Sequence, residues 1–120
     1  MRTGKEFSFR SRIKSFGYAF AGLTQLLKQE PNVRIHLVAT VAVIIAGIIQ
    51  KLSNAEWVVI AIAVGLVWIA EAFNTALEML CDLITDHTFH PVVKKIKDIS
   101  AAAVLVASIT SIIIALFVFL

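Results

Sequence analysis

Four polar residues within an otherwise apolar segment are the clearest candidates for chemistry. Glu71, Asn74, Glu78 and Asp82 follow a long apolar run that starts at Trp57. At 100° per residue they fall within about 80° of one another, which predicts one polar stripe along a helix face. A carboxylate inside a membrane helix costs about 3 kcal/mol, so such residues are functional candidates by default. We expect the stripe to run from mid-membrane at Glu71 to the membrane boundary at Asp82.

Further charged residues flank the neighbouring apolar segments. Glu30 precedes the first of them, and Lys97 and Asp98 stand at the start of the last. If the helices bundle, three acidic groups and a lysine meet at one membrane face. Carboxylate oxygens with room for phosphate oxygens suit Mg²⁺. Mg²⁺, a lysine and a further carboxylate as proton acceptor are the parts that phosphoryl transfer uses. No glycine-rich phosphate loop of the G-x-x-x-x-G-K-[ST] or G-x-G-x-x-G type occurs.

Other interpretations of these polar residues stay open. The stripe is compatible with hydrogen bonds that only join helices, or with a proton or ion relay through Glu71 and Glu78 in a protein that is not an enzyme. The basic residues at 94–97 also fit an anchor at the membrane face. His87 and His90 lack a cysteine partner and fit solvated loop residues better than metal ligands. His36 is interpreted as a residue at the membrane boundary.

Composition identifies the elements that must position these residues. Of 120 residues, 59% are apolar and 16% charged, and the mean hydropathy is +0.89. Soluble chains have about 45–50% apolar and 25% charged residues, so the apolar surplus has to face lipid. We predict an all-α integral membrane protein that forms one domain over residues 1–120. The predicted transmembrane helices are 33–52, 57–81 and 97–120.

A different kind of helix is predicted over residues 7–29. Apolar residues recur there at steps of three and four, with Arg10, Arg12 and Lys14 among them. That pattern is typical of an amphipathic helix on the membrane surface, with its basic groups toward lipid headgroups. Pro31 ends it, because the residue before a proline is disfavoured in the α region.

The basic residues also predict the orientation in the membrane. Seven of the eleven lie at or before residue 34, three lie at 94–97, and Lys51 alone lies near the turn between the first two spans. The positive-inside rule then places the N-terminus and the 82–98 loop in the cytoplasm and the C-terminus outside. With a net charge of only +3, attraction to anionic lipid explains the basic flank better than nucleic acid does.

Two long stretches of the chain resemble a known family. EAFNTALEMLCDL at 71–83 and HPVVKKIKDISAAAVLV at 90–106 are similar to the prokaryotic integral-membrane diacylglycerol kinases, which include the undecaprenol kinases. KSFGYAFAGL at 14–23 and QEPNVRIHL at 29–37 match in order and spacing as well. The resemblance implies a homotrimer with active sites between subunits at the cytoplasmic membrane face. It also implies transfer of the ATP γ-phosphate to a lipid hydroxyl, with Mg²⁺.

The resemblance implies a role for individual residues. Glu71 matches the catalytic base, and Glu30 and Glu78 match the carboxylates that hold Mg²⁺ on ATP. The positions matching nucleotide contacts are Arg12, Tyr18, Glu30, Asn74, Glu78, His90, Lys97 and Asp98. Glu71 and Ala101 match positions that face the lipid substrate.

Some positions depart from the family pattern. Its N-terminal arginine falls nearest Ser11, so Arg10 and Arg12 both qualify, and we favour Arg12. The loop before Lys97 is one residue longer than in the Gram-negative branch, which leaves the roles of His87 and His90 open. Ala101 replaces a serine of that branch. The VRIH run at 33–36, the HP pair at 90–91 and the lack of a tryptophan after the tyrosine at 18 favour undecaprenol over diacylglycerol as the acceptor.

Overall fold

The computed structural model describes residues 8–120, and within that range the chain is helical with no strand. Its four helices are α1 (Phe9–Gln29), α2 (Pro31–Gln50), α3 (Asn54–Thr85) and α4 (Pro91–Phe119). Phe7, where the first helix is predicted to begin, lies outside the described residues, as do Arg2 and Lys5 of the basic flank. Only α3 extends past both ends of its predicted span. The helix α2 begins and ends two residues before the predicted 33–52, and α4 begins six residues before the predicted 97–120 and ends one residue short of it.

Capping residues and prolines explain where each helix begins. Ser8 caps α1 by accepting a hydrogen bond from the Ser11 amide, and Pro31 takes the first position of α2. The turn into α3 is a capping box between Ser53 and Glu56. The His90 ring accepts from the Val92 amide at the start of α4, where the next residue is again a proline.

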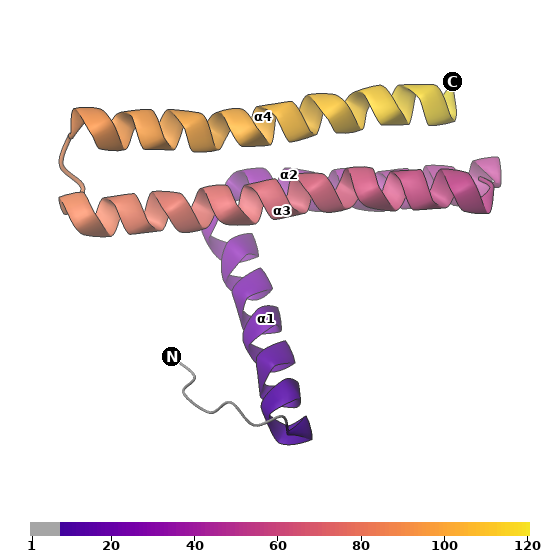
Figure 1. Cartoon of the computed structure of the whole chain (residues 1–120). Helices are drawn as coiled ribbons and strands as arrows, with labels where there is room; N and C mark the ends of the chain where they lie inside the picture. The colour runs from indigo at the N-terminus through magenta and orange to yellow at the C-terminus, as the bar shows by residue number, and fades with distance from the viewer. Residues whose placement is uncertain (1–7) are drawn as a thin grey trace.

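Three of the helices are long and apolar enough to cross a membrane, namely α2, α3 and α4. Figure 1 shows α3 and α4 side by side along their length, with α2 behind α3 and α1 leaving at a steep angle. The α3–α4 pair forms by far the most extensive helix contact, while α1 and α2 touch the rest at fewer points. The prediction of an all-α chain is confirmed for the described residues. The prediction of three helices whose length and composition suit a membrane span is confirmed as well.

The unequal lengths of the helices decide the depth of Glu71. His36 lies five residues into α2 and is hydrogen-bonded to Glu71, so the two residues share a level. At 1.5 Å per residue, Glu71 lies roughly 8 Å from the level of Pro31. Because α3 runs antiparallel to α2 and is 12 residues longer (32 against 20), Glu78 and Asp82 lie beyond the start of α2. Glu71 is therefore near one end of the apolar layer that α2 defines, and not at its middle as predicted.

Few side chains are buried, and most of them belong to α3. The buried apolar residues of the described chain are Leu26, Val33, Ile60, Ala63, Val67 and Cys81. At the far α2–α3 corner, Gly47 packs against the ring of Trp57, where a Cβ would lie 2.5 Å from the ring. Large apolar side chains are exposed along α2, α3 and α4, such as Ile49, Ile62 and Phe117. That surface is suited to lipid or to other subunits.

Candidate active site

The candidate base, Glu71, is buried on α3 and faces α2. Its side chain is only 3% exposed, and its Oε2 lies 3.3 Å from Nε2 of His36. The preceding turn of α3 adds a second link between these helices, because Nε1 of Trp68 donates to Oγ1 of Thr40 at 2.9 Å. The Thr40 hydroxyl in turn lies 2.7 Å from the carbonyl oxygen of His36. Glu71 is therefore held at an organised α2–α3 contact.

The next residues of the stripe face α4 and one another. Nδ2 of Asn74 donates to Oε1 of Glu78 at 3.3 Å, and Oγ of Ser100 donates to Oδ1 of Asn74 at 2.7 Å. Both Asn74 and Ser100 are buried. This network orients the Asn74 amide with its oxygen toward α4 and its nitrogen toward Glu78. One Glu78 oxygen is thereby fixed, about two turns of helix beyond the candidate base.

The charged residues at the α3–α4 end form two ion pairs. Nζ of Lys97 lies 2.5 Å from Oδ1 of Asp82, which joins the two helices. Nζ of Lys94 lies 2.7 Å from Oδ2 of Asp98, and that pair is confined to the exposed side of α4. Lys97 therefore faces the polar stripe, and Asp98 points away from it.

Glu30 lies between α1 and α2, where the charges of Glu71 and Glu78 act on its carboxyl group. Burial raises the pKa of the Glu30 carboxyl above its ordinary range, and the negative charges of Glu78 and Glu71 raise that pKa further. Its backbone amide donates to the Leu26 carbonyl oxygen, and its side chain makes no capping bond to α2. The structure thus brings Glu30, Glu71 and Glu78 within electrostatic reach of one another.

These carboxylates suit a divalent cation by their chemistry. The donors are all oxygens, and the lysines nearest the stripe pair with Asp82 and Asp98 and not with them. No group of three or more acidic, histidine or cysteine side chains within residues 8–120 is close enough to enclose a metal by itself. Mg²⁺ needs no such cage, since it usually takes one or two carboxylates and fills its other positions with water and phosphate oxygens. Glu30 and Glu78 fit that description.

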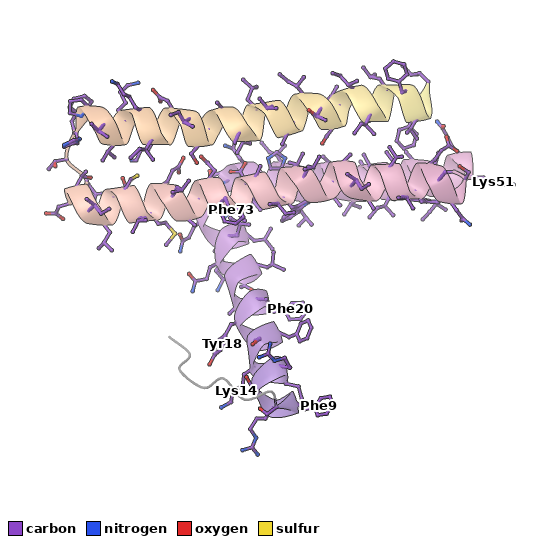
Figure 2. The ribbon with its side chains drawn as sticks, viewed as in Figure 1. Phe9, Lys14, Tyr18, Phe20, Lys51 and Phe73 are labelled. Carbon is purple, nitrogen blue, oxygen red and sulfur yellow. The ribbon has the colours of Figure 1, made fainter. Side chains whose placement is uncertain are left out.

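Four of the predicted site residues lie apart from the carboxylates. Tyr18 projects from the middle of α1, well away from α3 and α4, and is 68% exposed (Figure 2). Arg12 is exposed one and a half turns earlier on the same helix. His90 caps α4 at the loop, and Ala101 is exposed on α4 next to Ser100. Within this single chain these four residues do not complete the site.

Three residues of this site have roles that sequence reasoning missed. His36 contacts the candidate base, Ser100 orients Asn74, and Asp82 pairs with Lys97. The spacing of one helix shows which residues share a face but not which neighbouring helix that face meets. A histidine at the edge of an apolar segment was the available signal for His36, and it was interpreted as a boundary residue.

Comparison with known proteins identifies a matching family profile and two similar proteins. A family profile described as prokaryotic diacylglycerol kinase matches residues 17–119. The chain is 41% identical over 108 residues to a protein named undecaprenol kinase from Bacillus subtilis (strain 168), covering 90% of this chain and 87% of that protein. It is 40% identical over 102 residues to a diacylglycerol kinase of Synechocystis sp. (strain ATCC 27184 / PCC 6803 / Kazusa), covering 85% of this chain but only 58% of that protein.

Proposed function

The chain belongs to the prokaryotic diacylglycerol kinase family, and from this premise we propose that it transfers the γ-phosphate of Mg-ATP to the hydroxyl of a membrane lipid alcohol. The family resemblance predicted from the sequence is confirmed, and with it the enzyme class, a phosphotransferase with an alcohol acceptor. Undecaprenol is the favoured acceptor and diacylglycerol the next. The relative named undecaprenol kinase supports this order, since this chain covers most of it.

The observation that carries the proposal is the position of Glu71. Its buried carboxylate lies roughly 8 Å inside the end of α2, and Glu30 and Glu78 lie toward the aqueous side. A lipid whose hydroxyl sits at the membrane interface presents that hydroxyl at this depth, whereas a soluble alcohol would have to leave water to reach it. Phosphates, by contrast, approach from the aqueous side. The two reactants thus meet at Glu71 from opposite directions.

Each residue has a role in the proposed reaction. Glu71 accepts the proton of the attacking lipid hydroxyl. Glu30 and Glu78 would hold Mg²⁺, which when bound offsets the negative charge on the phosphates. Lys97, held next to the stripe by Asp82, adds a further positive charge. Asn74 contacts the nucleotide at the stripe, and Asp98 contacts it from the exposed side of α4. Such positioning and charge stabilisation account for most of phosphoryl-transfer catalysis.

The remaining parts of the proposal concern assembly. We place α1 on the membrane surface, and we place three chains in a homotrimer in the bacterial cytoplasmic membrane. The N-terminus and the 82–98 loop then face the cytoplasm. Arg12, Tyr18 and His90 are nucleotide contacts in this assembly, and Ala101 faces the lipid. Their separation from the carboxylates within one chain supports sites that are shared between neighbouring subunits.

A proton or ion relay through Glu71 and Glu78 receives no support from the structure. A relay needs titratable groups along its whole path. Within the described chain, none lies between the level of Glu71 and that of Glu56 at the other end of α3. In α2 none follows His36 before Lys51, and in α4 none follows Asp98. The described helices therefore carry no titratable group across the middle of the bundle.

The test is a phosphate-transfer assay on the purified full-length protein in mixed micelles. Wild-type protein receives γ-labelled ATP and Mg²⁺ with either undecaprenol or diacylglycerol, and we expect label in undecaprenol first. Glu71→Gln should lose about 10²–10⁴-fold in kcat, because the amide cannot accept the proton, while it still binds Mg-ATP. Glu56→Gln is the matched control, since it changes the same residue type at the opposite end of α3 and a glutamine still completes the capping box.

Each result bears on a separate part of the proposal. Wild-type turnover in Glu71→Gln would show that Glu71 is not the base. Label in diacylglycerol alone would reverse the order of acceptors. Absence of label in both lipids, from protein shown to be folded, would refute the lipid kinase activity of this chain. A pH-sensitive dye inside proteoliposomes then tests the relay, which predicts proton flux without ATP.

A further inference from the structure

We propose that His36 is a positioning residue, which donates from Nε2 to Oε2 of Glu71 and thereby leaves Oε1 to accept the proton of the lipid hydroxyl. This inference rests on the proposed function, in which Glu71 is the base. It gives the interhelical contact a specific task within that reaction. It also replaces the interpretation of His36 as a boundary residue.

The chemistry of the pair determines which partner donates. Nε2 of His36 and Oε2 of Glu71 are 3.3 Å apart. An ionised carboxylate has only acceptor atoms, so a base that is ready to take a proton requires the ring nitrogen to carry the hydrogen. That assigns the Nε2–H form of His36 in the resting site. Hydrogen bonds of catalytic groups are often long before substrate binds, and they shorten in the reacting complex.

The surroundings of Glu71 show why such a donor is needed. Glu30 and Glu78 place negative charge near Glu71, and neither can hydrogen-bond to it as an ion. Asn74, the nearest amide on the stripe, uses its nitrogen for Glu78 and its oxygen for Ser100. Among residues 8–120, His36 is the only side chain that hydrogen-bonds to the Glu71 carboxylate. Without His36, no side chain of residues 8–120 would hydrogen-bond to the Glu71 carboxylate and orient it against the negative charges of Glu30 and Glu78.

A second, separate hydrogen bond joins α2 and α3 close to the His36 ring. Oγ1 of Thr40 lies 2.7 Å from the His36 carbonyl oxygen, and Nε1 of Trp68 lies 2.9 Å from the same hydroxyl. Trp68 precedes Glu71 by about one turn of α3. Of these two bonds only the one from Trp68 crosses between the helices, and it does so without touching the His36 ring. The ring is only 21% exposed, so little water competes with Glu71 for it.

The experiment measures kcat and KM in the mixed-micelle assay for three variants. We expect His36→Leu to lower kcat about 10- to 100-fold, with the KM values for Mg-ATP and lipid unchanged, because a loosely held base is misaligned in the reaction but not in binding. His36→Gln should recover most of that loss, since its amide nitrogen reaches the position of Nε2. His36→Asn should recover less, because its amide is one bond shorter.

Thr40→Val is the matched control for a purely structural role. It removes the neighbouring α2–α3 hydrogen bond to Trp68 and leaves the His36–Glu71 pair in place. We expect it to lower the thermal midpoint without lowering kcat. Equal losses of kcat in Thr40→Val and His36→Leu would show that His36 only joins the helices, and would overturn the proposal.

The remaining outcomes are equally decisive. Wild-type kcat in His36→Leu, with Glu71→Gln inactive, overturns the role of His36 but leaves the base assignment intact. If His36→Leu fails to fold, the kcat values of His36→Gln and His36→Asn are compared instead. Equal kcat values for these two variants overturn the proposal. If the wild-type protein labels no lipid, it is the proposed function that fails, and the role of His36 fails with it.

Discussion

The α3–α4 hairpin and the α1–α2 pair hold their polar residues in different ways. In the hairpin, three polar contacts join the two helices: Asn74 meets Ser100, Asp82 meets Lys97, and Ser111 meets the Ala63 carbonyl. In the α1–α2 pair, no side chain of residues 8–120 pairs with the Glu30 carboxylate to offset its charge, and the charges of Glu71 and Glu78 repel it. Packing follows the same division, since α3 and α4 share the largest contact.

This difference indicates which part is scaffold and which part is active. Satisfied polar pairs rigidify the hairpin and keep Asn74 and Lys97 in fixed positions. The uncompensated carboxylate at the α1–α2 joint lowers stability in the absence of a cation, as groups held ready for function often do. The same kind of substitution, removal of one negative charge, should therefore have opposite effects on stability in the two regions.

The largest expected effect is that of Glu30→Gln. We expect at least about a 100-fold loss of kcat, because one of the two carboxylates proposed to hold Mg²⁺ is removed. In EDTA at pH 8, however, the thermal midpoint should rise by a few degrees, because repulsion from Glu71 and Glu78 is relieved. The measurements are the mixed-micelle assay and thermal unfolding in detergent. A lower midpoint at pH 8 would show that Glu30 is not repelled in the folded state.

The stability gain of Glu30→Gln should also depend on pH. The raised pKa means that folded protein binds a proton at Glu30 more tightly than unfolded protein does. The contribution of Glu30 to stability is therefore favourable below the unfolded pKa and is lost as pH rises through the higher folded pKa. The gain of the variant should be largest above that range and vanish in acid. A gain that grows in acid would contradict this sign.

Ser100→Ala should give the next largest effect, and in the opposite direction. It leaves the buried oxygen of Asn74 without its donor, which costs about 1–3 kcal/mol of unfolding free energy. Because Asn74 also loses its orientation, kcat should fall moderately with it. Unfolding in a graded denaturant measures the first quantity. Ser108→Ala on the same helix is the control, since Ser108 makes no hydrogen bond to Asn74. Unchanged stability in Ser100→Ala would mean that the hairpin tolerates an unpaired buried oxygen.

Asp82→Asn should have the smallest effect on stability. Its ion pair with Lys97 is about one third exposed on both sides, and such solvent-accessible pairs contribute little to stability. We expect a slight decrease in the thermal midpoint that shrinks further in high salt. An increase in the midpoint, as expected for Glu30→Gln, would remove the contrast between the two regions.

Much of the architecture follows from the sequence alone, for physical reasons. The apolar excess over 120 residues can be accommodated only by surfaces that avoid water, so membrane-spanning helices are predictable from composition and segment length. Pro31 and Pro91 mark helix starts because proline lacks the amide hydrogen that a helix interior requires. The polar stripe from Glu71 to Asp82 is predictable because α-helical periodicity is local.

Tertiary structure decided what each of these helix faces meets. It set Glu71 opposite His36, Asn74 opposite Ser100, and Asp82 opposite Lys97, although 35, 26 and 15 residues separate the partners. It also placed Glu71 near the end of the apolar layer, because α2 is shorter than α3. Local periodicity determines the face on which a side chain lies. The depth of a side chain in the apolar layer, and the residue that it contacts, depend on how the helices pack and on how far each helix extends beyond its neighbour.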